Sequence, residues 1–234
     1  MEKSYFIFLF LILLSCSREE VQISQKLEGF WVNEDKMLLF RDSLMLHPIY
    51  DAPGLFEFNI INENLIVSNK EEYFVNSYDT CSIKLVSENE LILMVGDDIT
   101  EFLKYVSTEG RFFNRLFFEV EPCHGTCPVF EVEIFSDGTV KYNGKAYTEI
   151  KGLKEYKLNT VIINEVNDLL EVVNILEYPE EKLSNPAGFP RFNLVVEYDD
   201  DLSISIVDGL FEGKYINVIK YFYFFERQLM ENSP

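Results

Sequence analysis

Histidine, cysteine and tryptophan are scarce in this chain of 234 residues, which has two histidines, four cysteines and one tryptophan. A Ser-His-Asp or Cys-His mechanism would have to use His47 or His124. His47 precedes Pro48 and is interpreted as a surface residue. Phosphate-binding glycine loops, nucleophile elbows and dinucleotide fingerprints are also missing from the sequence. These absences favour a non-enzymatic protein and predict no catalytic residue, metal site or cofactor.

Basic residues are few. The chain has 20 Lys and Arg and 40 Asp and Glu, so its formal charge is −20 at pH 7. Such a surface repels phosphate backbones, so nucleic acid is not expected as a partner. Among 40 acidic residues, suggestive carboxylate pairs arise by chance and identify no glycosidase centre. Asp199–Asp201 lacks the ligand spacing of a calcium loop and is interpreted as a hairpin turn. A hydrophobic content of 47% is nevertheless sufficient for folded cores.

The N-terminal apolar run, Tyr5 to Leu14, is too short to span a bilayer and is typical of a signal-peptide core. It ends in Leu13-Leu14-Ser15-Cys16, which resembles a bacterial lipobox. The resemblance implies that Cys16 is diacylated and becomes residue one of the mature chain. Residues 1–15 would then be the signal peptide and residues 16–24 a tether. An ordinary signal peptide that happens to contain a cysteine is the alternative.

The residue after the cysteine, Ser17, does not resemble an inner-membrane retention signal. The sequence therefore predicts a protein of the bacterial cell envelope, held at the outer membrane by a lipid on Cys16. It does not distinguish the periplasmic side from the surface side.

Strand-like runs separated by turn residues fill residues 25–107. Turns at Asp42-Ser43, Asn62–Asn64, Glu88-Asn89 and Gly96–Asp98 fit hairpins. About eight strands at this spacing predict an all-β meander closed into a small barrel. The runs are Leu27–Trp31, Met37–Phe40, Leu44–Leu46, Leu55–Ile61, Leu65–Val67, Tyr73–Val75, Cys81–Val86, Leu91–Val95 and Glu101–Val106.

Gly29-Phe30-Trp31 resembles the Gly-x-Trp of lipocalin-like domains, in which the tryptophan plugs the closed end of the barrel. The resemblance implies a cup for a small apolar ligand, with Trp31 as a possible cup residue. The alternative is a barrel filled by its own side chains. We favour the filled barrel because eight-stranded barrels have little spare interior.

A second module is predicted at residues 115–231, after a polar linker at Ser107–Asn114. Alternating apolar residues indicate strands at Leu116–Val120 and Phe130–Ile134. Asp137-Gly138 and Asn143-Gly144 are predicted to be hairpin turns, which gives four strands in meander order.

Two apolar stripes with helical spacing follow the meander. Asn159 or Thr160 can cap the first helix. Strands Phe192–Val196 and Leu202–Ile206 lie between the stripes. The pattern predicts an α+β domain with an antiparallel sheet of about six strands and two helices on one face. The stripes are Ile162, Val166, Leu169, Val173 and Leu176, then Tyr215, Val218, Phe222, Phe225 and Leu229.

Cys123 and Cys127 bracket a tight loop between the first two strands of this module, and Gly125 is expected to adopt a backbone angle that other residues resist. In an oxidising compartment such a pair favours a structural disulfide. A redox pair is a weaker alternative because the spacing is not Cys-x-x-Cys. A metal site is weaker still, since only His124 is nearby. Cys81, alone in a strand pattern, is predicted to be a small buried residue.

The run from Pro122 to Phe130, followed by Ser136–Val140 and Tyr142, resembles a family of bacterial lipoprotein domains. That family is recorded as a domain of unknown function with a Cys-x-Gly-x-Cys-Pro signature before a β-hairpin. The resemblance covers Leu116 to Leu229, and its specific part is Cys123–Tyr142. It implies an envelope setting and supplies no activity.

Three hypotheses follow. The first is a membrane-anchored envelope lipoprotein that binds or scaffolds an unknown protein or small molecule without catalysis. The second is a carrier of a small apolar ligand in the N-terminal barrel. The third is an envelope thiol or redox enzyme centred on Cys123 and Cys127.

Overall fold

The computed structural model describes residues 26–34, 36–42, 44–46, 55–61, 64–68, 78–108, 110–178, 188, 190–208, 215–223 and 225–231. The predicted signal peptide, Cys16, His47 and the predicted strand Tyr73–Val75 lie outside these residues. The chain forms two compact units that divide between Tyr105 and Val106. The predicted fold class, a barrel followed by an α+β domain, is confirmed.

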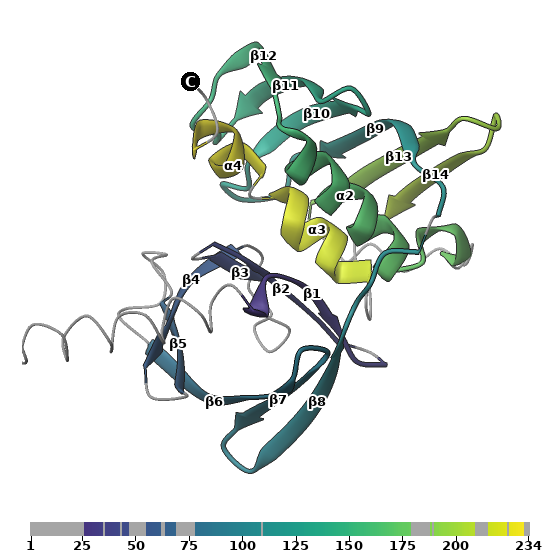
Figure 1. Cartoon of the computed structure of the whole chain (residues 1–234). Coiled ribbons are helices and arrows are strands. Elements are labelled where there is room, and N and C mark those ends of the chain that lie inside the picture. The colour runs from purple at the N-terminus through teal and green to yellow at the C-terminus, as the bar shows by residue number, and fades with distance from the viewer. Residues whose placement is uncertain are drawn as a thin grey trace, which may run out of the picture. The chain divides into compact units, whose positions relative to one another are not determined.

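The first unit is a closed barrel of strands β1 to β8, arranged in sequence order. Figure 1 looks down its axis. Antiparallel pairing of β1 with β8 closes the barrel. The strands are β1 (Gly29–Val32), β2 (Met37–Arg41), β3 (Leu44–Leu46), β4 (Leu55–Ile61), β5 (Asn64–Ser68), β6 (Tyr78–Ser87), β7 (Glu90–Val95) and β8 (Asp98–Lys104).

Apolar side chains line the inside of the barrel from alternate positions on its strands. On β7, buried Leu91 and Leu93 alternate with more exposed neighbours, as expected for strands that face a core on one side. The rings of Phe40 and Phe58 meet edge to face, with their centroids 5.2 Å apart. Cys81 is buried, as predicted for a small residue of the core.

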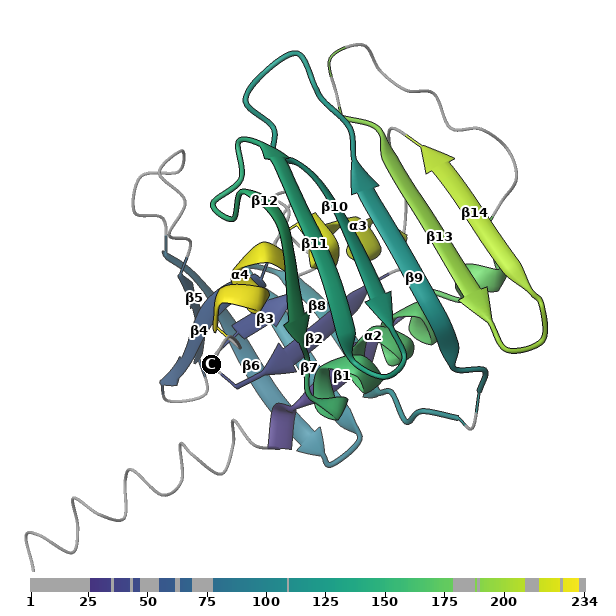
Figure 2. The same cartoon turned by 90° about the horizontal axis from the view of Figure 1, so that it is seen from above.

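The second unit contains a six-stranded antiparallel sheet in the order β12-β11-β10-β9-β13-β14. Figure 2 shows the helices gathered on one face of this sheet. The other face carries charged side chains. The strands are β9 (Phe113–Val120), β10 (Val129–Phe135), β11 (Thr139–Ala146), β12 (Gly152–Lys157), β13 (Phe192–Tyr198) and β14 (Ser203–Asp208).

The first predicted hairpin turn of this sheet is confirmed. β10 ends at Phe135 and β11 begins at Thr139. Gly138, between them, has a φ of 89°, which is unfavourable for residues with a Cβ. The Asp137 carboxylate also accepts a hydrogen bond from the backbone N–H of Thr139, at 2.8 Å.

The second predicted turn, Asn143-Gly144, is wrong. Both residues lie within β11, where Asn143 pairs with Glu131 and Gly144 with Phe130. The chain instead reverses after Ala146 and returns as β12. A Cβ on Gly144 would lie 1.9 Å from the carbonyl oxygen of Ile150, so glycine is required here by close backbone approach.

Helix α2 (Thr160–Val172) begins as predicted, because the Asn159 side chain accepts a hydrogen bond from the backbone N–H of Ile162 at 3.0 Å. Its end differs from the prediction. Asn174 is in the left-handed conformation, and a 3-10 turn, η1 (Ile175–Glu177), follows. Leu176, the last residue of the predicted stripe, is consequently 48% exposed.

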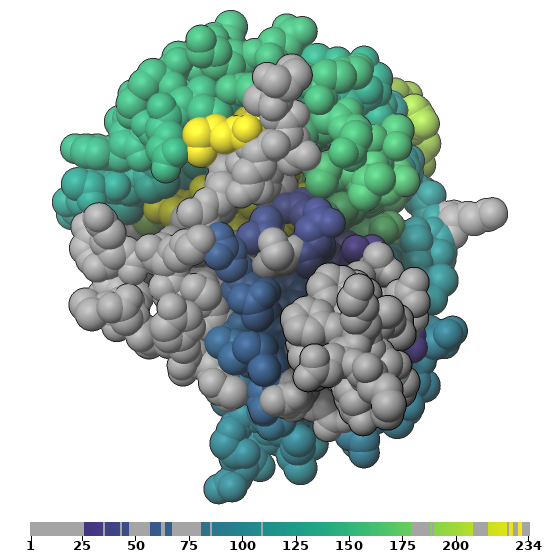
Figure 3. All heavy atoms as spheres, turned by 60° about the vertical axis from the view of Figure 1, so that its left-hand side comes forward, coloured from purple at the N-terminus to yellow at the C-terminus, as the bar shows by residue number. Residues whose placement is uncertain are grey.

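The second predicted stripe forms α3 (Ile216–Tyr223) and α4 (Phe225–Glu231). Four of its apolar residues are at most 1% exposed: Val218, Phe222, Phe225 and Leu229. The rings of Phe118 on β9 and Phe222 on α3 are 5.2 Å apart, which joins sheet and helix in one core. Figure 3 shows yellow residues of α4 at the surface of this unit. In the described part of the chain, no helix has the length and apolar character needed to cross a membrane.

Candidate functional site

The loop that joins β9 to β10 carries Cys123 and Cys127. Their sulfur atoms are 1.95 Å apart and their Cα atoms 5.9 Å apart, so the pair stands at disulfide distance. The backbone N–H of Gly125 points at the Cys123 sulfur, with an N–S distance of 3.2 Å. Gly125 does not adopt a positive φ, so its expected backbone angle is not observed. The short span between the cysteines, rather than a left-handed residue, brings the two sulfurs together.

Backbone hydrogen bonds attach this loop to the segment that precedes β13. The N–H of Glu121 donates to the carbonyl of Arg191 at 2.8 Å, and the N–H of His124 donates to the carbonyl of Gly188 at 3.3 Å. The His124 side chain is exposed, and both cysteines are half-buried. We call this cysteine pair, which lies at disulfide distance at the entrance to the β10–β11 hairpin, the clip.

Two observations on the surroundings of the clip bear on redox and metal chemistry. The loop connects two strands, and no described helix begins at it to stabilise a thiolate. Within the described ranges, no group of three or more His, Cys, Asp or Glu side chains is placed to hold a metal ion.

Trp31 lies opposite Lys104, on the face of the barrel wall that points inward. Its indole is fully buried, and Nε1 donates a hydrogen bond to the carbonyl of Leu27 at 2.6 Å. Lys104, on the last strand, places its ammonium 5.4 Å from the centre of the Trp31 ring. The same ammonium donates to the carbonyl of Lys26 at 3.2 Å. These contacts join the segment before β1 to β8 through Trp31 and Lys104.

Lys104 was not anticipated from the sequence, because its contact with Trp31 depends on the pairing of β8 with β1. On β8, buried Phe102 points into the barrel, and Lys104 lies two residues further along the same face. Its cross-strand partner is Trp31. A lysine in register with the only tryptophan of the chain indicates a cation–π contact.

The charged face of the C-terminal sheet is a second feature that was not anticipated from the sequence. Arg115 binds Glu133 and Glu197 at 2.6 and 2.7 Å, and Lys145 binds Glu119 at 3.1 Å and also Glu131. Burial alone would lower the pKa of Arg115, but hydrogen bonds and attraction from Glu133 and Glu197 raise it. These pairs neutralise much of the acidic charge on this face.

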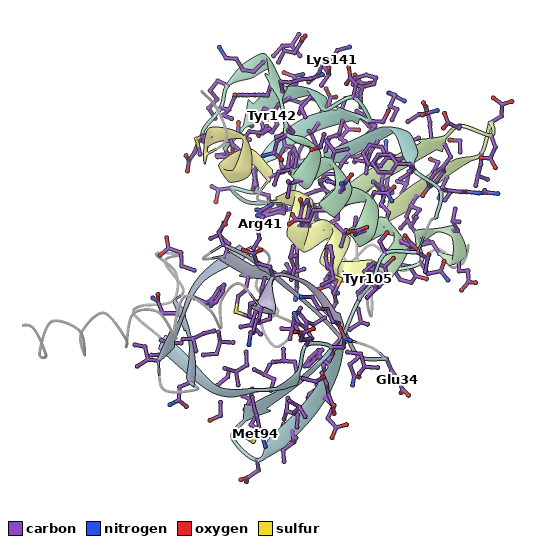
Figure 4. The ribbon with its side chains drawn as sticks, in the orientation of Figure 1. Glu34, Arg41, Met94, Tyr105, Lys141 and Tyr142 are labelled. Carbon is purple, nitrogen blue, oxygen red and sulfur yellow. A yellow bond between two sulfur atoms is a disulfide. The ribbon has the colours of Figure 1, made fainter. Side chains whose placement is uncertain are left out.

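Lys141 and Tyr142, labelled in Figure 4, are neighbours on β11 and belong to opposite faces of the sheet. Lys141 is 3.7 Å from the Glu133 carboxylate on the charged face. Tyr142 is fully buried on the helix side. Burial, together with the nearby Glu226 carboxylate, raises the pKa of the Tyr142 phenol far above its ordinary value. The phenol therefore remains neutral and contributes to the core.

A comparison with known protein families found a match to the second unit. Its residues 114–224 match a family model described as a domain of unknown function, DUF6438. The C-terminal half of this chain thus contains a DUF6438 domain. That domain begins within β9 and extends through the cysteine loop, the sheet and α2 into α3. No curated protein matches the chain.

Proposed function

We propose that this chain is a membrane-anchored lipoprotein of a bacterial cell envelope, in which the barrel and the DUF6438 domain form a non-enzymatic binding or scaffolding module. The observation that carries the proposal is the short apolar run Tyr5 to Leu14, followed at once by Ser15-Cys16. Two acyl chains on Cys16 would give stable anchoring of a chain with a charge of −20. The outer membrane is the proposed location.

The cysteine pair in the DUF6438 domain supports the same address. Disulfides persist in the envelope and are rare in the cytosol. Cys123 and Cys127 lie at disulfide distance in a partly solvent-exposed loop. An export signal and a cysteine pair at disulfide distance are both expected of a protein exported to the cell envelope.

Membrane fractionation tests the anchor. The wild-type chain should sediment with membranes and enter the detergent phase, and Cys16→Ser should release it to the soluble fraction. Ser17→Ala is the matched control and should leave the chain membrane-bound. A wild-type chain that is fully soluble without detergent would reject the lipoprotein proposal.

A carrier of a small apolar ligand is the second candidate, and the closed barrel favours it. Its interior is lined by apolar side chains, among them Phe40, Phe58 and Phe102, and Trp31 is fully buried. A brominated fatty acid is a suitable probe because Trp31 is the only tryptophan. Saturable quenching of Trp31 fluorescence would establish the carrier. A barrel filled by its own side chains should give no saturable quenching.

The third candidate, thiol or redox chemistry at Cys123 and Cys127, makes an opposite prediction about the two sulfurs. An enzyme would present a pair that cycles between thiols and disulfide with a small-molecule thiol. A structural clip should show no such turnover.

A further inference from the structure

Apolar side chains gather on the outer surface of the barrel, across β1, β7 and β8. Ile99 and Leu103 on β8 are 66% and 62% exposed. Met94 lies opposite Ile99, and Val32 lies opposite Leu103. Met94, labelled in Figure 4, lies near the tip of the β7–β8 hairpin. We call this surface the apolar face; it consists of Val32, Ile92, Met94, Ile99 and Leu103.

Alternation along the strands explains why these residues point outward. Phe102 is fully buried inside the barrel, so its neighbours on β8 face the opposite way. Single exposed apolar residues are ordinary, but contiguous apolar patches on a folded unit mark interaction surfaces.

Two carboxylates lie within the apolar face. Glu101 stands between Ile99 and Leu103 on β8, opposite Ile92, and Glu90 lies opposite Leu103. In the part of the chain that the structure describes, neither carboxylate forms an ion pair. This contrasts with the charged face of the DUF6438 domain, where Glu119, Glu131, Glu133 and Glu197 are paired.

A partner that covers the apolar face must remove water from these two carboxylates. Burying an unpaired charge costs several kcal/mol, so binding requires cations opposite them. Lys84, opposite Ile92, is the nearest cation of the barrel in this register. A second copy of the chain would therefore bring one lysine for two carboxylates. Residues 26–104 as a whole contain six basic and fifteen acidic residues, which makes self-association still less favourable.

We propose that the apolar face binds a partner protein through a segment that is apolar and carries lysine or arginine side chains opposite Glu90 and Glu101. Apolar contact supplies the affinity, and the two carboxylates select the partner by charge. The proposal goes beyond the anchoring proposal and holds whether or not Cys16 is acylated.

Peptide binding to the full chain carrying Cys16→Ser tests this inference. The probes are an amphipathic Leu/Lys peptide, a Leu/Glu peptide of the same length, and a Ser/Lys peptide with the same charge. Only the Leu/Lys peptide should bind with saturation at one peptide per chain. Equal binding of the Ser/Lys peptide would show nonspecific attraction to an acidic protein and would overturn the proposal.

Two paired substitutions locate the site. Ile99→Ser with Leu103→Ser should weaken binding of the Leu/Lys peptide by about tenfold or more, as expected for central apolar contacts. Leu153→Ser with Val207→Ser is the matched control, because these residues are 74% and 52% exposed in the other unit. The control should bind as the parent does. Equal weakening by both pairs, or by neither, would contradict the assigned surface.

Glu101→Gln tests the charge requirement and is not expected to impair folding, since the side chain is exposed. It should weaken binding several-fold and reduce the dependence of the affinity on salt. An unchanged affinity and salt dependence would refute the role of the carboxylate. Dimerisation of the peptide-free chain that is abolished by Ile99→Ser with Leu103→Ser would assign the face to a second copy and overturn the partner proposed here.

Discussion

Cys123 and Cys127 constrain only a short stretch of chain, because four positions separate them. A cross-link of this span removes less entropy from the unfolded chain than a long loop would. The clip nevertheless precedes β10, the strand that pairs with both β9 and β11. Its effect should be local to the entrance of the hairpin, without altering the buried face of the sheet.

Replacing both Cys123 and Cys127 by serine should lower the free energy of unfolding by about 1–3 kcal/mol while the domain stays folded. Urea unfolding followed by circular dichroism measures the change. Thiol titration of the folded, envelope-extracted protein supplies the complementary test. Two reactive thiols at these positions would reject the disulfide and favour the redox or metal alternatives.

Alanine substitutions at Gly144 and Gly125 test whether close backbone approach requires glycine at position 144. Gly144→Ala would push a Cβ against the Ile150 carbonyl, and we expect a loss of about 1–3 kcal/mol, typical of overpacking. Gly125→Ala is the control, because its Cβ would meet the Cys123 sulfur at an ordinary 3.8 Å. Unfolding free energies of both variants provide the comparison. A larger loss for Gly125→Ala would mean that the assigned backbone approach at Gly144 is wrong.

At the scale of elements, strands were easier to predict than their connections. Alternation located β9, β10 and β13 because each buries one face. The turn at Asn143-Gly144 was misplaced because the dipeptide suits a hairpin, whereas the requirement at Gly144 comes from Ile150, which lies outside any local window.

Prediction of the candidate site was limited in the same way, because contacts between segments far apart in sequence leave no local pattern. The Cys123–Cys127 pairing was predictable from two cysteines in a short reversal. The backbone hydrogen bonds from this loop to Gly188 and Arg191 were not predictable, because they join segments far apart in sequence. Lys104 over Trp31 likewise depends on how β8 closes against β1.

Helix α2 makes a prediction about pH. Burial raises the pKa of Asp168, a hydrogen bond from Ser107 opposes this shift, and the nearby Glu171 adds to it. A carboxyl whose pKa is raised by folding binds its proton more tightly in the native state. Its contribution to stability is therefore greatest at low pH and is lost as the pH rises through the folded pKa.

Asp168→Asn should accordingly remove a loss of unfolding free energy that accompanies rising pH in the range just above the ordinary carboxyl pKa. Chemical unfolding at several pH values measures the slope. A loss of unfolding free energy with rising pH that is greater in Asp168→Asn than in the wild type would reverse the assigned direction of the shift.

At the scale of the whole molecule, the chain divides between Tyr105 and Val106, close to the predicted linker Ser107–Asn114. Residues 106–108 and 110–112 are exposed, although Thr108 is hydrogen-bonded to Glu171. Exposed segments between packed units open to proteases before the strands do.

Limited proteolysis should therefore cut first within Ser107–Asn114 and leave two stable fragments. Mass spectrometry of the early products identifies the site, and Arg111 offers a trypsin target. Arg111→Gln is the control and should remove that tryptic cut without affecting cleavage by a less specific protease. Resistance of the whole segment would show that the chain behaves as one domain.

The central claim is that this chain is an envelope lipoprotein, and the chemical structure of its mature N-terminus tests that claim most directly. Intact mass and peptide mass spectrometry of the protein purified from membranes should find Cys16 as the first residue, carrying a diacylglyceryl group on its sulfur. A mature chain that begins elsewhere, or a Cys16 with an unmodified thiol, would contradict the account.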